Sequence, residues 1–251
     1  VEAVVAAASL ADAVTDAEAI LTMLPNGAIV RAVHAEIVAL ARPGALLIDC
    51  STIDVESARA VHDLAMDADL IALDAPVSGG TGGAAAGTLT FMVGGAEGAF
   101  ELGRPLFEVM GSKAVHCGSA GAGQAAKICN NMILGISMVA VCEGFHLADS
   151  LGLSRQAMFD VASTSSGSCW ALNTYCPAPG IGPKTPADNG YRPGFATELM
   201  LKDLTLAAEA AKASGANAAL GEHARAIFEA FDAAGGRGRD FSALLEQMGT
   251  R

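Results

Sequence analysis

One lysine, Lys127, lies in the otherwise small and apolar stretch GAGQAAKICNN (121–131), and Asn131 follows it four residues later. In a helix, residues four apart share a face. The neighbours of Lys127 are small or apolar, so we expect its side chain to be buried. Burial lowers the pKa of an ammonium group, which lets a lysine exchange a proton near neutral pH. The stretch therefore indicates a general acid or base, and a solvated lysine at a helix start is the alternative.

Three short apolar runs end in stretches that could bind a ligand: MLPNG (23–27), CSTID (50–54) and DAPVSGG (74–80). The carboxyl ends of parallel strands meet at one edge of a sheet, which is where such sheets bind ligands. Glycines after Ser78 would let backbone N–H groups approach a carboxylate closely. Each stretch also has a purely structural interpretation, as a turn or a helix N-cap. Lys202 and Asp203 are two further charged residues inside an apolar helix. Adjacent helical residues point in different directions and do not easily pair with each other, so the structural alternative is a charged stripe on one side of the helix.

The elements that must position these residues follow from periodicity. Short apolar runs predict strands at 18–24, 45–50, 69–77, 88–95 and 113–118. Helical patterns separate them at 28–41, 55–67 and 96–111. This alternation predicts βαβ units and a parallel sheet. After Gly121 only helices are predicted, a long one to about 152 and others at 154–163, 196–215 and 220–235. We expect an α/β domain over 1–121 and an all-helical domain over 122–251.

Composition excludes several classes of protein. The net charge is −12 and Lys and Arg are not clustered, so neither nucleic acid nor an anionic membrane surface is an expected partner. The longest apolar stretch, 132–142, is too short to span a bilayer. Six cysteines without a C-x-x-C pair predict free thiols in a reducing compartment, with no metal site.

A Pro/Gly-rich segment, 175–194, is unusually long for a loop in a compact domain. Segments of this kind are functional or disordered. This one contains both tyrosines of the chain, and Trp170 lies just before it. We expect an ordered loop at a binding site, with a mobile surface loop as the alternative.

Several motifs resemble one known family in order and spacing: TMLP, LLIDCSTID, DAPVSGGTGGAAAGTLTFMVGG, GSAGAGQAAKICNNMILGISM and LMLKDLTLA. That family is the β-hydroxyacid dehydrogenases of the 6-phosphogluconate dehydrogenase-like superfamily. SSGSCW (165–170) and NTYCPAPG (173–180) resemble its 3-hydroxyisobutyrate dehydrogenase branch. The resemblance covers the whole chain. It implies a Rossmann-like α/β parallel sheet, N-terminally incomplete, followed by an all-α domain with a long interdomain helix.

The resemblance also assigns roles to particular residues. Lys127 matches the catalytic lysine, and Asn131 an asparagine that orients the substrate. Ser78 and Gly79 match the loop that binds the substrate carboxylate. The remaining matches are cofactor contacts and residues of the substrate pocket: Leu24, Pro25, Thr52 and Lys202 for the cofactor, and Trp170, Phe195 and Asp203 for the pocket.

The resemblance implies that the protein would oxidise 3-hydroxyisobutyrate to methylmalonate semialdehyde with NAD, in valine degradation. It would be a homodimer or homotetramer of the bacterial cytoplasm or the mitochondrial matrix. The alternatives are another small-molecule substrate (serine, tartronate semialdehyde or succinic semialdehyde) and a non-catalytic helical dimerisation module. The sequence departs from the family in one respect, because no G-x-G-x-x-G loop precedes the first strand. We therefore expect that the N-terminal dinucleotide-loop segment is lacking, and the pyrophosphate-binding residues are not assigned.

Overall fold

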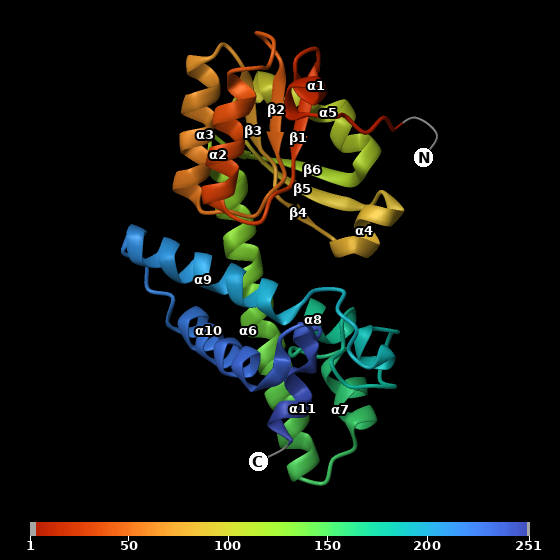
Figure 1. The fold of residues 1–251 in the computed structure, drawn as a ribbon. Helices are drawn as coiled ribbons and strands as arrows, with labels where there is room; N and C mark the ends of the chain where they lie inside the picture. The colour runs from red at the N-terminus through yellow and green to blue at the C-terminus, as the bar shows by residue number, and fades with distance from the viewer. Residues whose placement is uncertain (1–3, 250–251) are drawn as a thin grey trace. The chain divides into compact units, whose positions relative to one another are not determined.

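The structure of the protein is a computed structural model that describes residues 4–249. The chain divides into two compact units, Val1–Lys127 and Ile128–Arg251. Each unit has its own secondary structure and its own core (Figure 1). The division falls within the long helix α6 (Ala122–Ser150), whereas the predicted domain boundary lay just before it.

The first unit is built on a six-stranded sheet in the order β1-β2-β3-β5-β4, with β6 paired to β5. The strands are β1 (Ala19–Thr22), β2 (Leu46–Asp49), β3 (Ile71–Asp74), β4 (Val77–Ser78), β5 (Leu89–Gly94) and β6 (Gly111–Gly118). All the predicted strands are present. The sheet is mixed rather than wholly parallel, because the chain reverses between β4 and β5, and β5 runs antiparallel to both β3 and β4.

Helices cover both faces of this sheet, with α2 and α3 on one side and α5 on the other (Figure 1). The helices of the unit are α1 (Leu10–Val14), α2 (Gly27–Val38), α3 (Val55–Asp67), α4 (Gly80–Ala86) and α5 (Glu97–Met110). Asn26 caps α2 and Asp54 caps α3, each by accepting a backbone N–H bond at its side-chain oxygen. The sequence did not predict α4, because its GTGGAAA sequence favours a turn.

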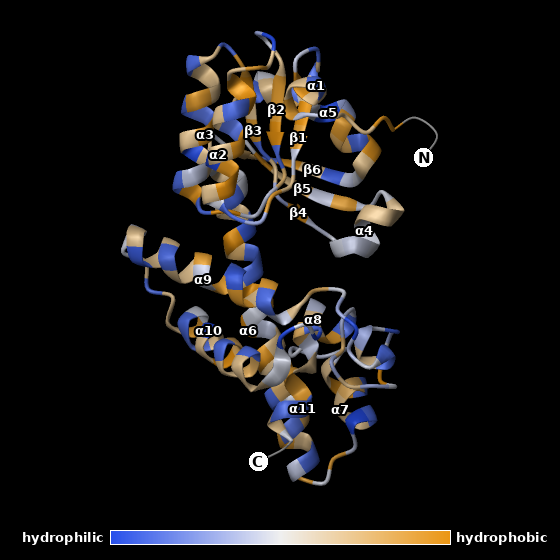
Figure 2. Ribbon diagram, viewed as in Figure 1, coloured by the Kyte–Doolittle hydropathy of each residue, from blue (hydrophilic) through white to orange (hydrophobic). Residues whose placement is uncertain are grey.

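The core of this unit has two apolar clusters, one on each face of the sheet. Successive residues of β2 alternate between them, as a strand buried on both faces requires. Leu47 packs with Val30 and Ile37 of α2, whereas Ile48 packs with Phe107 of α5. In Figure 2, β1 and β2 are strongly hydrophobic, while the helices mix apolar and polar residues. The amphipathic helices thus bury the sheet.

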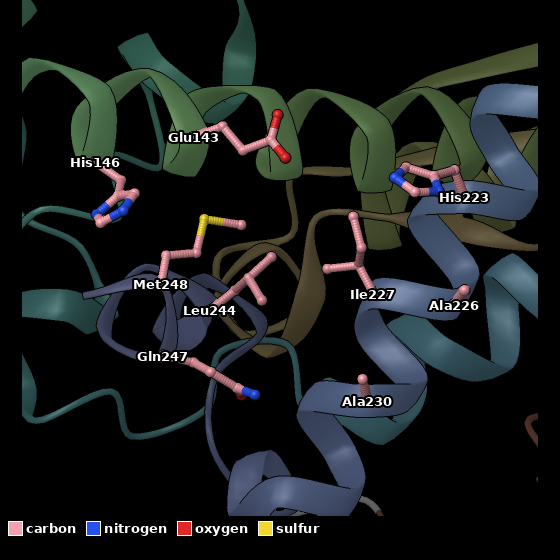
Figure 3. A pocket seen from close by; sticks show the side chains of 9 residues that line it. All are labelled: Glu143, His146, His223, Ala226, Ile227, Ala230, Leu244, Gln247 and Met248. Carbon is pink, nitrogen blue, oxygen red and sulfur yellow. The ribbon is translucent and has the colours of Figure 1, made fainter. Parts of the chain in front are cut away.

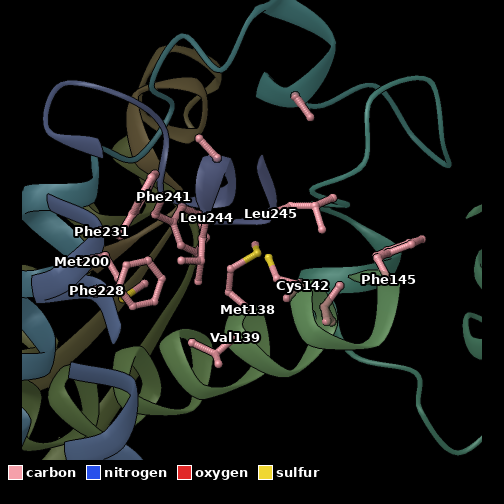
Figure 4. Close-up of a cluster of buried hydrophobic side chains, with 14 of the residues drawn as sticks. Met138, Val139, Cys142, Phe145, Met200, Phe228, Phe231, Phe241, Leu244 and Leu245 are labelled. Atoms are coloured by element: carbon pink, nitrogen blue, oxygen red, sulfur yellow. The ribbon is translucent and has the colours of Figure 1, made fainter. Parts of the chain in front are cut away.

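The second unit is all-helical over the described residues. Its elements after α6 are α7 (Arg155–Ala162), α8 (Trp170–Asn173), η1 (Pro186–Asn189), α9 (Thr197–Ser214), α10 (Ala219–Phe231), η2 (Asp232–Gly236), η3 (Phe241–Ala243) and α11 (Leu244–Met248). One apolar cluster joins them, and Figure 4 shows Met138 and Cys142 of α6 facing Met200 and Leu244. The predicted long helix and the three helices after it are therefore present.

By length and composition α6 is the one helix, among the described residues, that could cross a membrane. Buried helices of globular proteins have the same composition. Met138, Cys142 and Phe145 of α6 are fully buried in the core cluster. The apolar character of α6 is accounted for by this packing.

Candidate functional site

The edge of the sheet at which β1, β2 and β3 end is the first part of the site. Their last residues, Thr22, Asp49 and Asp74, are register partners across the two parallel pairs. The loops after these strands therefore leave the sheet side by side, as the sequence predicted. Thr52 lies in one loop, half-exposed between buried Ser51 and Ile53.

A buried hydrogen-bond network fixes the first two loops to the sheet. Asp49 Oδ1 accepts the hydroxyls of Thr22 at 2.8 Å and of Ser51 at 2.6 Å. Ser51 Oγ in turn accepts the Leu24 N–H at 2.8 Å. Because the Thr22 hydroxyl donates to Asp49, it must accept from His34 Nε2, 2.9 Å away. This places the His34 proton on Nε2.

Two buried atoms of this network, His34 Nδ1 and Asp49 Oδ2, have no hydrogen-bond partner among the described residues. Burial lowers the pKa of His34, against the opposing effect of the Asp49 charge. Burial, together with the same carboxylate, raises the pKa of the neighbouring Cys50 to about 12. His34 is thus neutral and Cys50 an unreactive thiol at physiological pH.

Asp74, at the end of β3, holds the first turn of α6. Its carboxylate accepts the backbone N–H of Gly121 at 2.8 Å and of Gln124 at 2.9 Å. His62 Nε2 lies 3.0 Å from the same carboxylate. A negative charge here also complements the positive end of the helix dipole. Asp74 is 2% exposed, so it is a buried N-terminal cap.

Backbone packing sets the same turn against the sheet. A Cβ atom on Gly123 would lie 2.3 Å from the Met92 carbonyl oxygen and 2.5 Å from that of Asp74. Only glycine can occupy this position without moving the backbone. The first turn of α6 is therefore tightly placed on the ends of β3 and β5.

Lys127 is one turn further along α6 and is only 8% exposed. Its Nζ donates to the Val77 carbonyl at 2.8 Å. Val77 and Ser78 form β4, and Gly79 follows with φ of 133°, a backbone conformation that favours glycine. The first unit thus brings the predicted lysine to the predicted carboxylate-binding loop.

Asn131, on α6, pairs with Asp203 of α9. Its Nδ2 donates to Asp203 Oδ2 at 2.5 Å, and its Oδ1 accepts from Asn130 Nδ2 at 2.9 Å. Both Asn131 and Asp203 are buried. Lys202, the preceding residue of α9, is partly exposed. The second unit thus brings two of the predicted pocket residues together.

Trp170 and Phe195 belong to an aromatic cluster of the second unit. Trp170 stacks on Tyr175 at 5.0 Å, and Phe195 meets Phe241 edge-on at 5.5 Å. Tyr175 and Phe241 are also in contact, with centroids 5.4 Å apart. Trp170 is 51% exposed, so about half of its surface is accessible despite the stacking on Tyr175.

Asp240 organises this cluster and was not singled out from the sequence. Its Oδ2 accepts the Tyr175 hydroxyl at 2.9 Å and the backbone N–H groups of Gly194 and Phe195. Burial, and then the Asp240 charge, raises the pKa of Tyr175 far above its usual range. The segment 175–194 also carries its own buried bond, from Tyr191 Oη to the Pro177 carbonyl at 2.9 Å. These contacts favour the ordered-loop interpretation.

A hollow elsewhere in the second unit contains none of the predicted site residues. Figure 3 shows it between α6, α10 and α11, with Glu143 above, His146 and His223 on either side, and Leu244 and Met248 below. Among residues 4–249, no group of three or more His, Cys, Asp or Glu side chains is placed to hold a metal ion. The hollow is therefore not part of the predicted site.

The α/β unit with three loops side by side at one sheet edge, the buried Lys127 and the helical unit that follows agree with the expected NAD-dependent hydroxyacid dehydrogenase. Comparison with protein families agrees. Residues 1–118 match the NAD binding domain of 6-phosphogluconate dehydrogenase, and residues 121–248 match the family described as NAD-binding of NADP-dependent 3-hydroxyisobutyrate dehydrogenase. The chain belongs to the 3-hydroxyisobutyrate dehydrogenase family.

Individual relatives show the same similarity. A probable 3-hydroxyisobutyrate dehydrogenase of Mycobacterium bovis is 51% identical over 243 residues, covering 97% of this chain and 82% of that protein. The NAD-dependent L-serine dehydrogenase of Pseudomonas aeruginosa is 44% identical over 242 residues, covering 95% and 81%. The solved structure of Mycobacterium tuberculosis 3-hydroxyisobutyrate dehydrogenase with L-serine has a TM-score of 0.92 at 51% identity, covering 96% of this chain and 82% of that chain.

These matches correct one expectation. The predicted lack of the N-terminal dinucleotide-loop segment is not borne out, because the nucleotide-binding family model matches residues 1–118. The non-catalytic alternative is also set aside, since the protein is an NAD-dependent oxidoreductase.

The residues at the sheet edge fit the cofactor. Leu24, Pro25 and Thr52 leave at least part of their surfaces exposed at the carboxyl ends of β1 and β2. The Ser51 hydroxyl accepts the Leu24 N–H and donates to Asp49, and these hydrogen bonds hold the two loops against the end of the sheet. An apolar rim with one hydroxyl suits a ribose and a nicotinamide ring.

Proposed function

We propose that this protein oxidises 3-hydroxyisobutyrate to methylmalonate semialdehyde, a step of valine degradation, with Lys127 as the proton acceptor. The observation that carries the proposal is the 2.8 Å bond from Lys127 Nζ to the Val77 carbonyl, next to Ser78 and Gly79. One group able to move a proton and one loop able to hold a carboxylate are thereby adjacent. A 3-hydroxy acid carries the two groups that such a pair would recognise.

Lys127, as a neutral amine, takes the proton of the substrate hydroxyl. NAD⁺, when bound, supplies the acceptor for the hydride that leaves the carbinol carbon. In the reverse direction the Lys127 ammonium donates the proton to the aldehyde oxygen and stabilises the negative charge that develops on it.

Ser78 and the Gly79 backbone bind the substrate carboxylate. Asn131 orients the substrate, and Asp203 fixes the Asn131 amide through the 2.5 Å bond. Holding the carboxylate and the hydroxyl at once limits the reacting carbon to one position, which accelerates the reaction by orientation.

Four residues hold the cofactor in this proposal: Leu24, Pro25, Thr52 and Lys202. The first three are at the sheet edge described above. Lys202, on α9, provides a positive charge for an anionic group of the cofactor. The Ser51 hydroxyl holds the backbone of Leu24, which reduces the backbone freedom that this loop would lose on binding the cofactor.

The choice of substrate depends on the group at carbon 2. 3-Hydroxyisobutyrate carries a methyl group there and L-serine an ammonium, while the carboxylate and the primary alcohol are common to both. Trp170 and Phe195 offer apolar surface for a methyl group. These two aromatic side chains offer no carboxylate to an ammonium, and burial of an ammonium without such a partner is costly.

L-Serine is the second candidate, because a relative at 44% identity is named an NAD-dependent L-serine dehydrogenase. The solved structure of the 51% identical M. tuberculosis relative with L-serine also supports L-serine as a candidate. Asp203 is the buried carboxylate that an ammonium group would seek in this alternative.

A panel of substrates tests the proposal. The initial rate of NADH formation should be measured with 3-hydroxyisobutyrate, L-serine and 3-hydroxypropionate, and the reverse rate with tartronate and succinic semialdehydes. We expect kcat/KM to be highest for 3-hydroxyisobutyrate, with a loss of about tenfold on removal of the methyl group. A higher kcat/KM for L-serine or another member of the panel would overturn the substrate assignment.

A further inference from the structure

Gln124 makes an unusual pair of contacts on α6. It is fully buried, at 0% exposed. Its Oε1 accepts the Ile53 N–H at 3.1 Å, and its Nε2 donates to the Ser51 carbonyl at 2.8 Å. One side-chain amide thus satisfies the backbone on both sides of Thr52.

The hydrogen bonds that begin at Gln124 also reach the loop after β1, which carries Leu24. Ser51, whose carbonyl accepts from Gln124, uses its hydroxyl to accept the Leu24 N–H at 2.8 Å. Gln124 is itself fixed, because its backbone N–H donates to Asp74 Oδ2 at 2.9 Å. A series of hydrogen bonds therefore runs from the first turn of α6 to the residues on either side of Thr52, where the bonds are buried, and on to Leu24, where the bond is part-buried.

We infer that Gln124 is a positioning residue, which sets Thr52 and, through Ser51, Leu24 relative to the turn of α6 that carries Lys127. Gln124 lies three residues before Lys127 and directs its side chain to a different loop, so it has no part in proton transfer. The inference rests on the proposed cofactor roles of Thr52 and Leu24. The opposing interpretation is that Gln124 only satisfies buried backbone groups and contributes to stability.

Two variants separate the links of this series. Gln124→Met keeps the length of the side chain and removes both hydrogen bonds, which leaves the Ile53 N–H and the Ser51 carbonyl unpaired. Ser51→Ala leaves the Gln124 hydrogen bonds in place and removes the link to Leu24, together with the Ser51 hydroxyl bond to Asp49. Ser51→Ala is a small change, so it keeps the inference testable if Gln124→Met does not fold.

The control is His116→Phe. His116 Nε2 bonds to the Gly95 carbonyl at 2.9 Å, and its ring stacks on Phe100 at 5.2 Å. Phenylalanine keeps the stacking and removes the hydrogen bond. This control loses one hydrogen bond in the same unit without touching Thr52 or Leu24.

The experiment is a titration of each full chain with NADH in the absence of substrate, followed by ligand fluorescence. Thermal unfolding and amide hydrogen exchange at residues 51–53 are measured in parallel on the free proteins. We expect the NADH Kd to rise about tenfold in Gln124→Met and about threefold in Ser51→Ala, with faster exchange at 51–53. His116→Phe should lower the melting temperature and leave Kd unchanged.

An NADH Kd that is unchanged in both variants, with a fall in melting temperature like that of the control, would overturn the inference and leave Gln124 a purely structural residue. Failure of the proposed function gives a different result. In that case the unmodified protein oxidises no 3-hydroxy acid, or Lys127→Ala retains its rate. The NADH titration still reports on Gln124, since it requires neither substrate nor turnover.

Discussion

Replacing Asp74 by alanine tests the account of how α6 is anchored. The carboxylate is 2% exposed and accepts three hydrogen bonds, two from the backbone of the first helical turn and one from His62. The substitution leaves the N–H groups of Gly121 and Gln124 without their partner. It also removes a negative charge from the positive end of the helix dipole.

The magnitude follows from these contacts. Loss of an N-terminal cap costs about 0.5–2 kcal/mol. A buried donor left unsatisfied costs about 1–3 kcal/mol, and water entering the vacated space recovers part of this. We therefore expect Asp74→Ala to lower the free energy of unfolding by about 3 kcal/mol, which most domains survive.

Urea unfolding followed by circular dichroism measures this loss. Asp63→Ala is the matched control, because Asp63 is an exposed aspartate of α3 and its removal should change stability by less than about 0.5 kcal/mol. The rate with NAD and 3-hydroxyisobutyrate should also fall, since the anchored turn leads directly to Lys127. A loss of stability in Asp74→Ala below about 1 kcal/mol would refute the anchoring role.

Three further predictions concern packing, pH and the aromatic cluster. Gly123→Ala should destabilise the protein by about 3 kcal/mol or more in urea unfolding, because its Cβ would overlap two backbone carbonyls. The control Gly98→Ala, in open space on α5, should be neutral or stabilising by up to about 1 kcal/mol. Equal effects of the two substitutions on stability would contradict the close packing at Gly123. Burial lowers the pKa of His34 in the folded state, so the unfolded chain takes up the proton first as the pH falls below the ordinary value of 6.5. Stability should then decline by up to about 1.4 kcal/mol per pH unit until the folded pKa is reached, and His34→Leu, compared across pH 7 to 4, should lack this share of the decline. Asp240→Ala should lower the melting temperature and raise KM for the hydroxy acid, because it frees the backbone of Phe195; an unchanged KM would contradict its role in holding the cluster.

The secondary structure was predictable wherever the spacing of apolar residues followed one clear pattern. Apolar runs of four to eight residues gave the strands, and the 3.6-residue pattern gave the longer helices. The helix α4 escaped prediction because its glycines have low helix propensity, and it forms against β5 in the folded chain. The antiparallel course of β5 also escaped, because strand direction depends on pairing and not on local pattern.

The site was predictable to the extent that its residues stand out locally. Lys127 does so as a charge among apolar neighbours. Asp74 and Gln124 do not, since an aspartate after a strand and a glutamine in a helix are ordinary. Their roles depend on partners far away in sequence, as in the bond between Gln124 and Ile53, 71 residues apart. Such contacts arise only when the sheet brings its loops to one edge.

The most direct test of the central claim is the initial rate of NADH formation from NAD⁺ and 3-hydroxyisobutyrate by the unmodified chain and by Lys127→Ala. Lys113→Ala is the matched control, because Lys113 is an exposed lysine of β6. The account predicts that Lys127→Ala loses about 10²–10⁴-fold in kcat while retaining NADH binding, and that the control retains its rate. A Lys127→Ala variant with most of its turnover intact would contradict it.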